Sequence, residues 1–363
     1  MTILYDEGQL AIATESRRIL EARIETEALL PLLEQQGAVH DGFWDVAKQQ
    51  GWTALALPEA YGGLDLGLIE MGLIAHQAGR SISGAPFLTS SFGAAKAIEL
   101  YGSDDQKSRY LPALACGDMI GTVAFAQGPD TLAEPSALRL DGDKLSGSID
   151  GVAAGQQADI AILLAETDKG PALALVPCAP AQRSPIDSFD NSRSYAALRF
   201  DAAPAETLVN GPQARDAALH ILALQAVVTA HEQTGGAEVL MEIARDYANT
   251  RKAFGQPIGA FQSIKHRIAE IYSLVELARA NCIRAAAAEG DEFLKAAAAA
   301  RLSATEAYDT AARDCIQIHG GIGVTWELGL HLHMRRARSL AIEQGSSFFW
   351  EDILVNELAG EVA

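Results

Sequence analysis

The chain has 363 residues, of which 49% are hydrophobic and 21% are charged, a composition typical of a globular chain of about two to three domains. Its 47 acidic residues outnumber its 28 basic residues and give a formal net charge of −19. This balance argues against nonspecific binding to nucleic acid or to an anionic membrane, and we predict neither as a partner. An anionic ligand remains compatible with it, because a few local arginines can outweigh the global charge at a pocket.

The cysteines and the apolar runs bear on the compartment. The four cysteines form no CxxC motif, and no histidine pair has metal-ligand spacing; they are Cys116, Cys178, Cys282 and Cys315. We therefore expect buried thiols in a reducing compartment, and no metal site. The first residues lack the apolar core of a signal peptide, and no apolar run approaches the ~20 residues of a membrane span. The sequence predicts a cytoplasmic protein.

Residues 1–118 are predicted to be mainly helical. Apolar residues recur at roughly helical spacing near the start; they are Leu10, Ile19, Leu20, Ile24, Leu29 and Leu30. Pro58 and the pair Gly62-Gly63 predict a turn, after which a helical pattern resumes over residues 66–79.

Residues 119–211 are predicted to be strands. Short apolar runs alternate there with Gly, Pro, Asp and Ser; the runs are residues 119–126, 159–166, 171–177 and 195–202. Asp141-Gly142 lies between two such segments and predicts a hairpin. Four or more short strands at this spacing indicate a small barrel or a sandwich.

Residues 212–363 are again predicted to be helical, and they are rich in alanine. The first helix is long, with Gly235-Gly236 as a potential weak point. Glu289-Gly290-Asp291 predicts the end of the second helix and the start of the third. Long alanine-rich helices pack closely, as in a four-helix bundle.

Three sets of motifs make this order of elements specific. RKAFGQPIGAFQ (251–262) follows the long helix, and QIHGGIGVTWE (317–327) follows the third. PEAYGG (58–63) and YGSDDQKSRYLPALACGD (101–118) lie in the first helical zone. Together they closely resemble the acyl-CoA dehydrogenase family, in the expected order and over nearly the whole chain.

The resemblance implies an α+β fold with an N-terminal helical domain (1–118), a middle β domain (119–211) and a C-terminal four-helix bundle (212–363) for FAD binding and oligomerisation. It also implies a reaction, the FAD-dependent oxidation of an acyl-CoA thioester between Cα and Cβ. A carboxylate removes the α proton and hydride passes from Cβ to the flavin, which gives a 2-enoyl-CoA. The implied partners are an electron-transferring flavoprotein and further subunits, in a homo-oligomer or a heteromer.

The same resemblance assigns six residues to the FAD site. Arg251 matches the family arginine that lies against the cofactor of the neighbouring subunit, and a guanidinium fork suits pyrophosphate oxygens. Phe254 is expected to pack on the cofactor and Gln262 to bind its adenosine half. Gln317, Gly320 and Gly321 complete the set, because glycine lets a backbone approach a dinucleotide closely.

Each of these residues also has a purely structural interpretation. Arg251 fits a solvated cation at a helix C-terminus, and Phe254 fits an ordinary core residue. Gly320-Gly321 fits a helix C-cap, which is compatible with cofactor binding. For His319 we expect packing or capping and no catalytic role.

The middle zone departs from the family at the positions that line the flavin. Ala126, Gln127 and Gly128 stand where Thr, Glu and Pro are expected. Gly151 and Ala153 stand where a Trp and a Thr or Ser are expected. The sequence therefore predicts that this middle domain holds the flavin ring poorly by itself.

The catalytic base is also unusual. Gln344 falls on the position of the family's commonest base, and an amide takes no proton usefully; Glu343 is the adjacent candidate. At the family's second base location the chain has Gln225 and Ala226. Glu232, further along the same helix, is expected to be a surface or ion-paired carboxylate.

Three hypotheses follow from this pattern. In the first, the chain is one subunit of a heteromeric acyl-CoA dehydrogenase that shares its active site with a related chain, of the kind that oxidises bulky thioesters such as those of sterol side chains. In the second, it is a self-sufficient homo-oligomer that uses Glu343 as its base. In the third, it is a non-catalytic acyl-CoA-binding or scaffold subunit that has lost flavin chemistry.

Overall fold

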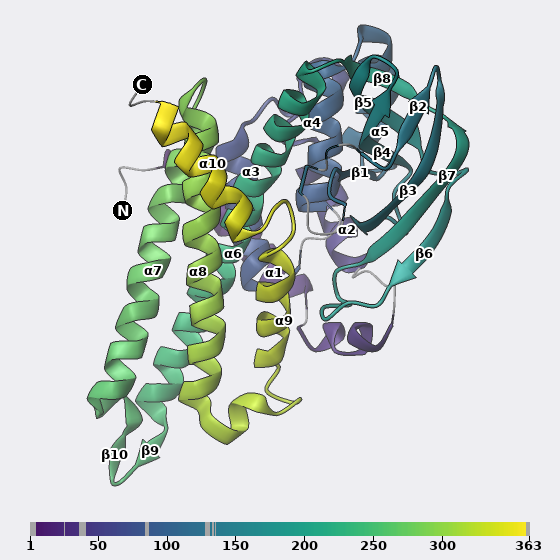
Figure 1. Cartoon of the computed structure of the whole chain (residues 1–363). Coiled ribbons are helices and arrows are strands. Elements are labelled where there is room, and N and C mark those ends of the chain that lie inside the picture. The colour runs from purple at the N-terminus through teal and green to yellow at the C-terminus, as the bar shows by residue number, and fades with distance from the viewer. Residues whose placement is uncertain are drawn as a thin grey trace. The chain divides into compact units, whose positions relative to one another are not determined.

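The structure, a computed structural model, describes residues 5–24, 26–35, 41–83, 87–127, 131–132, 134 and 136–360 (Figure 1). Contacts group the chain into two compact units. Unit 1 comprises Met1–Leu30, Gly72–Ser83 and Ala226–Ala363, and unit 2 comprises Pro31–Met71 and Gly84–Gln225. The three-domain division at residues 118 and 211 stays a prediction.

Helices occupy the first third of the chain, as the apolar periodicity predicts. They are α1 (Glu7–Arg23), α2 (Asp41–Gln49), α3 (Leu68–Arg80), α4 (Phe92–Tyr101) and α5 (Asp104–Ala115). Capping boxes fix two of the starts, with Asp6 and Gln9 at α1 and Ser103 and Gln106 at α5. The predicted turn at Gly62 is present, since this residue has φ +84°.

Eight strands then form one sheet in unit 2. They are β1 (Gly121–Ala124), β2 (Arg139–Asp141), β3 (Lys144–Ala153), β4 (Ile160–Thr167), β5 (Gly170–Pro177), β6 (Gln182–Ile186), β7 (Tyr195–Pro204) and β8 (Glu206–Asn210). The order is β6-β7-β3-β2-β4-β5-β8, with β1 paired in parallel to β4. The predicted hairpin joins β2 to β3, where Asp141 pairs with Lys144 and Gly142 has φ +62°.

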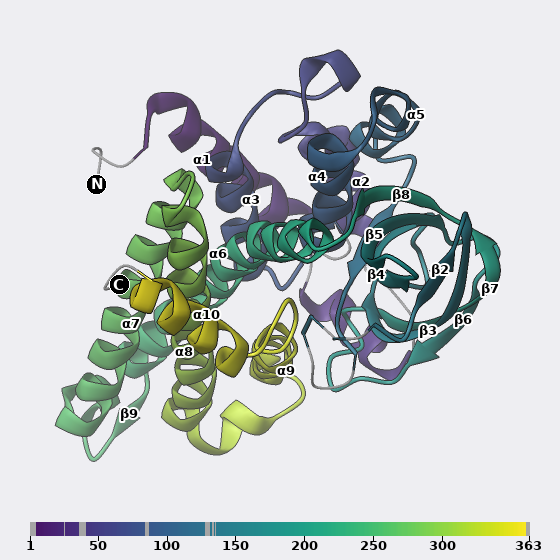
Figure 2. The same ribbon diagram turned by 45° about the horizontal axis from the view of Figure 1, so that its top comes forward.

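This sheet curls over one apolar core, so it is closer to a barrel than to two stacked sheets (Figure 2). Alternate residues of β4 point inward; Ala161, Leu163 and Ala165 are all fully buried. β5 also contacts β7, although the two strands do not pair. The prediction of a small barrel or sandwich is thereby narrowed to a single curled sheet.

Helices return after β8. They are α6 (Gln213–Thr250), α7 (Gln262–Ala287), α8 (Glu292–His319), α9 (Leu330–Leu340) and α10 (Ser347–Gly360), with the short hairpin β9 (Lys252–Ala253) and β10 (Gln256–Pro257) after α6. The predicted break between α7 and α8 lies at Gly290, which has φ +56°. In unit 1, α7 runs beside α8, and α9 and α10 also contact α8 (Figure 1).

The expected weak point in the first long helix is wrong, because α6 continues unbroken through Gly235 and Gly236. Both glycines serve close packing inside unit 1. A Cβ at Gly235 would lie 1.9 Å from the carbonyl oxygen of His76 on α3, and one at Gly236 would lie 2.4 Å from the ring of Tyr308 on α8. Because these glycines have no side chain, α3 and α8 can pack closely against α6. The glycines do not interrupt α6.

We expect Gly235→Ala to lower the free energy of unfolding by about 1–3 kcal/mol, because a methyl group forces α3 and α6 apart. The clash involves a backbone carbonyl, which cannot rotate away. Chemical denaturation of both proteins measures the difference. Gly360→Ala is the matched control, since nothing lies within 4 Å of that position. Equal denaturation midpoints for Gly235→Ala and the wild type would contradict the prediction.

Candidate functional site

All six residues predicted to bind FAD lie at one end of unit 1, the lower end in Figure 1. Arg251 follows the last residue of α6, Phe254 lies in the β9–β10 turn and Gln262 begins α7. Gln317 is in the last turn of α8, and Gly320-Gly321 opens the 3-10 helix Gly320–Val324. All six are exposed. The structure thus gathers on one surface the residues that the motifs predict, and their role there stays a prediction.

The backbone around Arg251 is well defined. Its N–H donates to the carbonyl of Tyr247 at 2.8 Å, and its carbonyl accepts from the N–H of Ile258 at the same distance. These two bonds close the base of the β9–β10 hairpin. The exposed guanidinium therefore projects from a fixed backbone at the end of α6.

Phe254 is not a core residue, because its side chain is 96% exposed. It occupies the tip of the hairpin with φ +52°, followed by Gly255 with φ +81°. Positive φ at both central residues matches the twist of a two-residue hairpin, but it strains any residue that has a Cβ. The ring meets the edge of the Phe261 ring, with centroids 6.2 Å apart, and leaves most of its surface exposed.

The two glycines after α8 leave open space on the surface. Nothing lies within 4 Å of a Cβ built on Gly320 or on Gly321. Gly320 has φ +63°, and its N–H donates to the carbonyls of Gln317 and Ile316. Gly320 is thus a helix C-cap, and the same turn offers bare backbone to a ligand.

His319 is a packing residue, as expected. It is only 6% exposed, and its ring stacks on that of Tyr247 with centroids 4.0 Å apart and an interplanar angle of 23°. Its Nδ1 lies 2.8 Å from the carbonyl oxygen of Cys315, to which it donates. Burial raises the pKa of the Cys315 thiol to about 12, so this neighbour stays uncharged.

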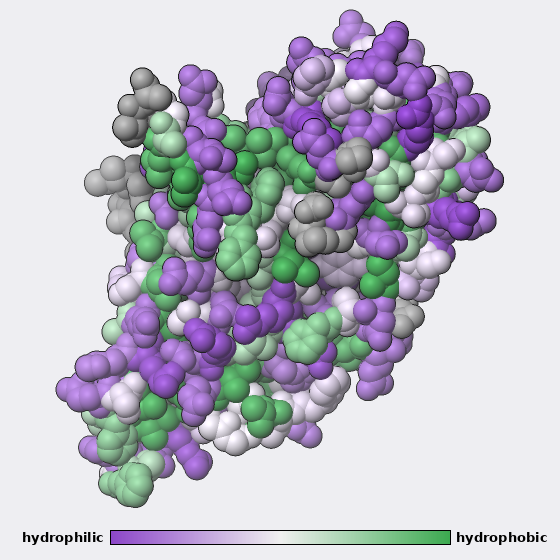
Figure 3. Space-filling model, viewed as in Figure 1, coloured by the Kyte–Doolittle hydropathy of each residue, from purple (hydrophilic) through white to green (hydrophobic). Residues whose placement is uncertain are grey.

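Apolar side chains surround this end of the bundle. Figure 3 shows hydrophobic surface among hydrophilic residues over the hairpin and the 3-10 helix. Besides Phe254, large apolar residues in and after the 3-10 helix are exposed; they are Ile322, Val324, Trp326 and Leu328, with Val324 at 71%. Such a patch is typical of a protein–protein contact.

Glu343 and Gln344 lie in the loop between α9 and α10. Glu343 is 8% exposed, and its carbonyl accepts from Arg301 Nη2 at 2.7 Å. Gln344 has φ +51°; its Oε1 accepts from Thr229 Oγ1 at 2.9 Å and its carbonyl accepts from Trp350 Nε1 at 2.9 Å. These bonds hold the loop, and they place an amide at the position where the resemblance predicts a base.

The second base location holds another amide. Gln225 is 2% exposed, and its Nε2 donates to the carbonyl of Thr89 at 2.6 Å. Its amide lies close to Gly93 on α4, where a Cβ would come within 2.5 Å. Ala226 beside it is fully buried. Neither an amide nor a methyl group is a useful base.

Glu232 is an ion-paired carboxylate in the core of unit 1. Its Oε1 lies 3.0 Å from Nη1 of Arg336, and the two side chains are 0% and 1% exposed. The same Arg336 nitrogen donates to the carbonyl of Ser83 at 3.2 Å. The pairing gives Glu232 a structural role. Of the two expected interpretations, a surface carboxylate or an ion-paired one, the structure shows the ion-paired one.

Two of the middle-zone residues that depart from the family pattern, Gln127 and Gly151, have clear roles in the local backbone structure. Gln127 is tied to its own loop, since its Nε2 donates to Ser136 Oγ at 3.1 Å and its Oε1 accepts from the N–H of Ala137 at 2.8 Å. Gly151 lies in a bulge of β3 with φ +71°, a conformation that disfavours the tryptophan of the family. Gly128 lies outside the described residues.

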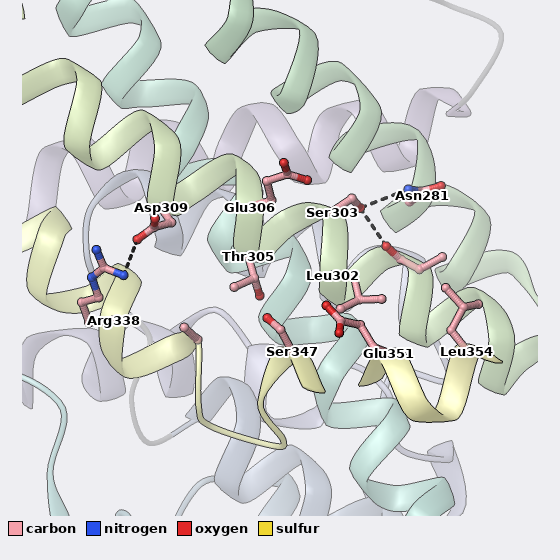
Figure 4. Close-up of a pocket in the computed structure, with 12 residues that line it drawn as sticks. Asn281, Leu302, Ser303, Thr305, Glu306, Asp309, Arg338, Ser347, Glu351 and Leu354 are labelled. Atoms are coloured by element: carbon pink, nitrogen blue, oxygen red, sulfur yellow. Dashed lines mark hydrogen bonds and ion pairs between the residues drawn. The ribbon is translucent and has the colours of Figure 1, made fainter. Parts of the chain in front are cut away.

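A separate pocket of about 740 Å³ lies on α7, α8, α9 and α10 (Figure 4). Its polar lining includes Ser303, which accepts from Asn281, and the ion pair between Arg338 and Asp309 at 2.7 Å. None of the predicted site residues lines it. Among the described residues, no group of histidine, cysteine and acidic side chains is placed to hold a metal ion.

Sequence reasoning missed two residues that shape these sites, Tyr247 and Arg301. Arg301 is 1% exposed and holds the loop that contains Glu343 by donating to the carbonyls of Leu340 and Glu343. Its signal was an arginine directly after the alanine run 296–300 of α8, a place where a charged side chain needs buried partners. Tyr247 had no signal beyond its position four residues before Arg251.

Comparison with known proteins identifies the family. The model of the acyl-CoA dehydrogenase N-terminal domain matches residues 6–118, and that of the C-terminal domain matches residues 215–358. The acyl-CoA dehydrogenase IpdE2 of Mycobacterium tuberculosis is 32% identical over 82% of this chain and 80% of its own length.

Two solved structures share the fold over almost the full chain. The ChsE4-ChsE5 complex from Mycobacterium tuberculosis has a TM-score of 0.89 at 25% identity, covering 99% of both chains. The Tcur3481-Tcur3483 steroid ACAD G363A variant has a TM-score of 0.87 at 26% identity, covering 98% of this chain and 99% of that one. This chain therefore belongs to the acyl-CoA dehydrogenase family of FAD-dependent oxidoreductases.

Proposed function

We propose that this chain is one subunit of a heteromeric acyl-CoA dehydrogenase and that it completes an FAD site held mainly by a related partner chain. The observation that carries the proposal is the contrast between two parts of unit 1. The residues expected to bind cofactor are gathered and exposed, whereas Gln344 stands at the family's base position, fixed by Thr229 and Trp350.

The surface at the end of unit 1 fits the dinucleotide. An exposed guanidinium at Arg251, a bare backbone turn at Gly320-Gly321 and an exposed ring at Phe254 supply charge, close approach and an apolar face. Gln262 and Gln317 add donors and acceptors at the adjoining ends of α7 and α8. These residues would bind and orient FAD, which supplies the hydride acceptor when bound.

In the proposed reaction an acyl-CoA thioester loses a proton from Cα and hydride from Cβ, and an electron-transferring flavoprotein takes up the electrons. In the shared site, the partner chain contributes the carboxylate that removes the proton. The names of two relatives, a ChsE4-ChsE5 complex and a steroid ACAD, support a two-chain assembly and a bulky substrate.

The location of the protein is part of the same proposal. Among the described residues, no helix is long and apolar enough to cross a membrane. All four cysteines are free thiols, three of them buried and Cys116 exposed, which corrects the expectation of four buried ones. Free thiols suit a reducing compartment, and we propose the cytoplasm.

The flavin content of the purified chain tests the proposal. We expect the chain alone to be colourless or substoichiometric in flavin, and to form a yellow, active complex when co-expressed with a related dehydrogenase chain. Absorbance in the flavin band and oligomer mass are measured on the same sample. About one FAD per chain and full turnover in a homomeric species would overturn the proposal. A complex that forms without flavin would favour the non-catalytic scaffold.

A self-sufficient homomer is the second candidate, and Glu343 favours it, because this carboxylate stands next to Gln344 in the loop between α9 and α10. In that case we expect Glu343→Gln to lose nearly all turnover, about 100-fold or more, while FAD stays bound. A steady-state assay measures the turnover, and the flavin absorbance spectrum measures the bound FAD. Glu351→Gln, an exposed carboxylate on α10, is the control. Undiminished activity of Glu343→Gln removes Glu343 from the mechanism.

A further inference from the structure

The two segments expected to hold the pyrophosphate end different helices. Arg251 follows α6, and Gly320-Gly321 follows α8. A dinucleotide that contacts both requires a fixed spacing between the two helix ends, because a shift of about 1 Å is enough to spoil a binding geometry.

Side-chain packing does not hold the glycine turn in place. Nothing lies within 4 Å of a Cβ built on Gly320 or Gly321, and Gly320 is held through its N–H, which donates to the carbonyls of Gln317 and Ile316. The turn is held by the residues on either side. Gly323 is buried, with the carbonyl of Ile316 2.5 Å from its Cβ position, and His319 is buried against Tyr247.

One aromatic contact joins the two helix ends. The rings of Tyr247 and His319 stack with their centroids 4.0 Å apart. Tyr247 accepts a hydrogen bond from the N–H of Arg251 through its carbonyl, at 2.8 Å, and His319 is bonded directly to Gly320. Each of the two stacked residues is therefore joined through its backbone to a residue of the expected FAD site.

Further contacts hold the His319 ring and the backbone beside each of the two residues. The Nδ1 of His319 donates to the carbonyl of Cys315, one turn earlier on α8, at 2.8 Å. Thr250 Oγ1 donates to the carbonyl of Tyr247 at 3.2 Å. Directly before Cys315 on α8, Asp314 pairs with Arg267 of α7 at 2.5 Å. The stacked rings thus join the C-terminal ends of α6 and α8, and further hydrogen bonds hold each of these ends.

We propose that Tyr247 and His319 are positioning residues for FAD: their stacked rings set the distance between the Arg251 guanidinium and the Gly320-Gly321 backbone, so that both reach the same dinucleotide. The inference rests on the proposed function, and it adds two residues that themselves touch no cofactor. Their effect on FAD passes through Arg251 and the glycine turn.

The test uses the assembled FAD-binding protein, stripped of flavin and titrated with FAD while flavin fluorescence is followed. Tyr247→Leu and His319→Leu each remove the stack, and we expect each to weaken FAD binding about 3–10-fold. The double leucine variant is expected to be no weaker than either single variant, because the two rings act as one contact. Tyr272→Leu removes an exposed ring from α7 and serves as the control.

Ring-retaining variants separate positioning from general stability. Tyr247→Phe and His319→Phe keep the stack, so we expect FAD affinity within 2-fold of the wild type. Leucine variants that bind FAD as tightly as the wild type, or phenylalanine variants as weak as the leucine ones, overturn the inference alone. A wild-type assembly that binds no FAD overturns the proposed function as well. Either leucine variant suffices, should the other fail to assemble.

Discussion

Replacing Arg251 with alanine will weaken FAD binding by the assembled enzyme about 10- to 100-fold, as measured by titration of the flavin-free protein with FAD. The guanidinium is exposed at the end of α6, and its backbone is fixed by the bonds to Tyr247 and Ile258. Charge-assisted hydrogen bonds to phosphate contribute about 1.5–3 kcal/mol, which corresponds to this change in affinity. The fold should be unaffected, because the Arg251 side chain is exposed and its removal leaves no cavity in the core.

Two further variants sharpen this prediction. Arg251→Lys keeps the charge and loses the two-pronged geometry, so its affinity should fall between those of alanine and the wild type. Lys252→Ala removes the same charge from the next residue, which is exposed on β9, and should leave FAD binding nearly unchanged. Equal losses for Lys252→Ala and Arg251→Ala would reduce the effect to local charge. Unaltered FAD binding by Arg251→Ala would remove this residue from the cofactor site.

Glu232→Ala will lower the free energy of unfolding by about 3–5 kcal/mol, as measured by urea denaturation. The carboxylate is fully buried, and its Oε1 lies 3.0 Å from Arg336 Nη1. Removal of Glu232 leaves the charge of a side chain that is 1% exposed without its counterion, which costs far more than the pair itself contributes. Arg336→Ala should destabilise the protein by a similar amount for the converse reason.

Matched substitutions distinguish this buried pair from an ordinary ion pair. Asp246→Ala breaks the exposed pair with Arg245, at 2.8 Å, and should cost less than about 1 kcal/mol. Glu232→Leu combined with Arg336→Met replaces both charges by apolar groups and should recover most of the lost stability. A wild-type denaturation midpoint for Glu232→Ala would contradict the structural role of Glu232.

The positions of helices and strands were largely predictable, because apolar periodicity reports which face of an element is buried. The run at residues 159–166 became β4, and the break at Gly290 separates α7 from α8. Gly235-Gly236 was misjudged, since glycine lowers helix propensity only by about 1 kcal/mol and close contacts with His76 and Tyr308 outweigh that loss. Such contacts depend on helices that are distant in the chain.

The candidate site divides in the same way. Motifs predicted which residues belong to the FAD site, including Arg251, Gln262 and Gly320-Gly321, and local turns and caps fix the helix ends on which they lie. The structure places these residues on one exposed surface, and their role in binding FAD stays a prediction. The conformation of Gln344 could not be predicted from the sequence, because it depends on hydrogen bonds from Thr229, 115 residues away, and from Trp350. The positive φ of Phe254 and the exposure of its ring likewise could not be predicted, because both depend on the conformation of the β9–β10 turn.

By itself the sequence determined the family and the order of helical and β zones, and it predicted that amides, Gln344 and Gln225, stand where the resemblance expects a base. These follow from residue identity, spacing and local backbone preference, which act over a few residues. Only the tertiary structure decided that Glu232 is neutralised by Arg336 and that Tyr247 stacks on His319. Such contacts join segments far apart in the chain, and the packing of whole helices selects them.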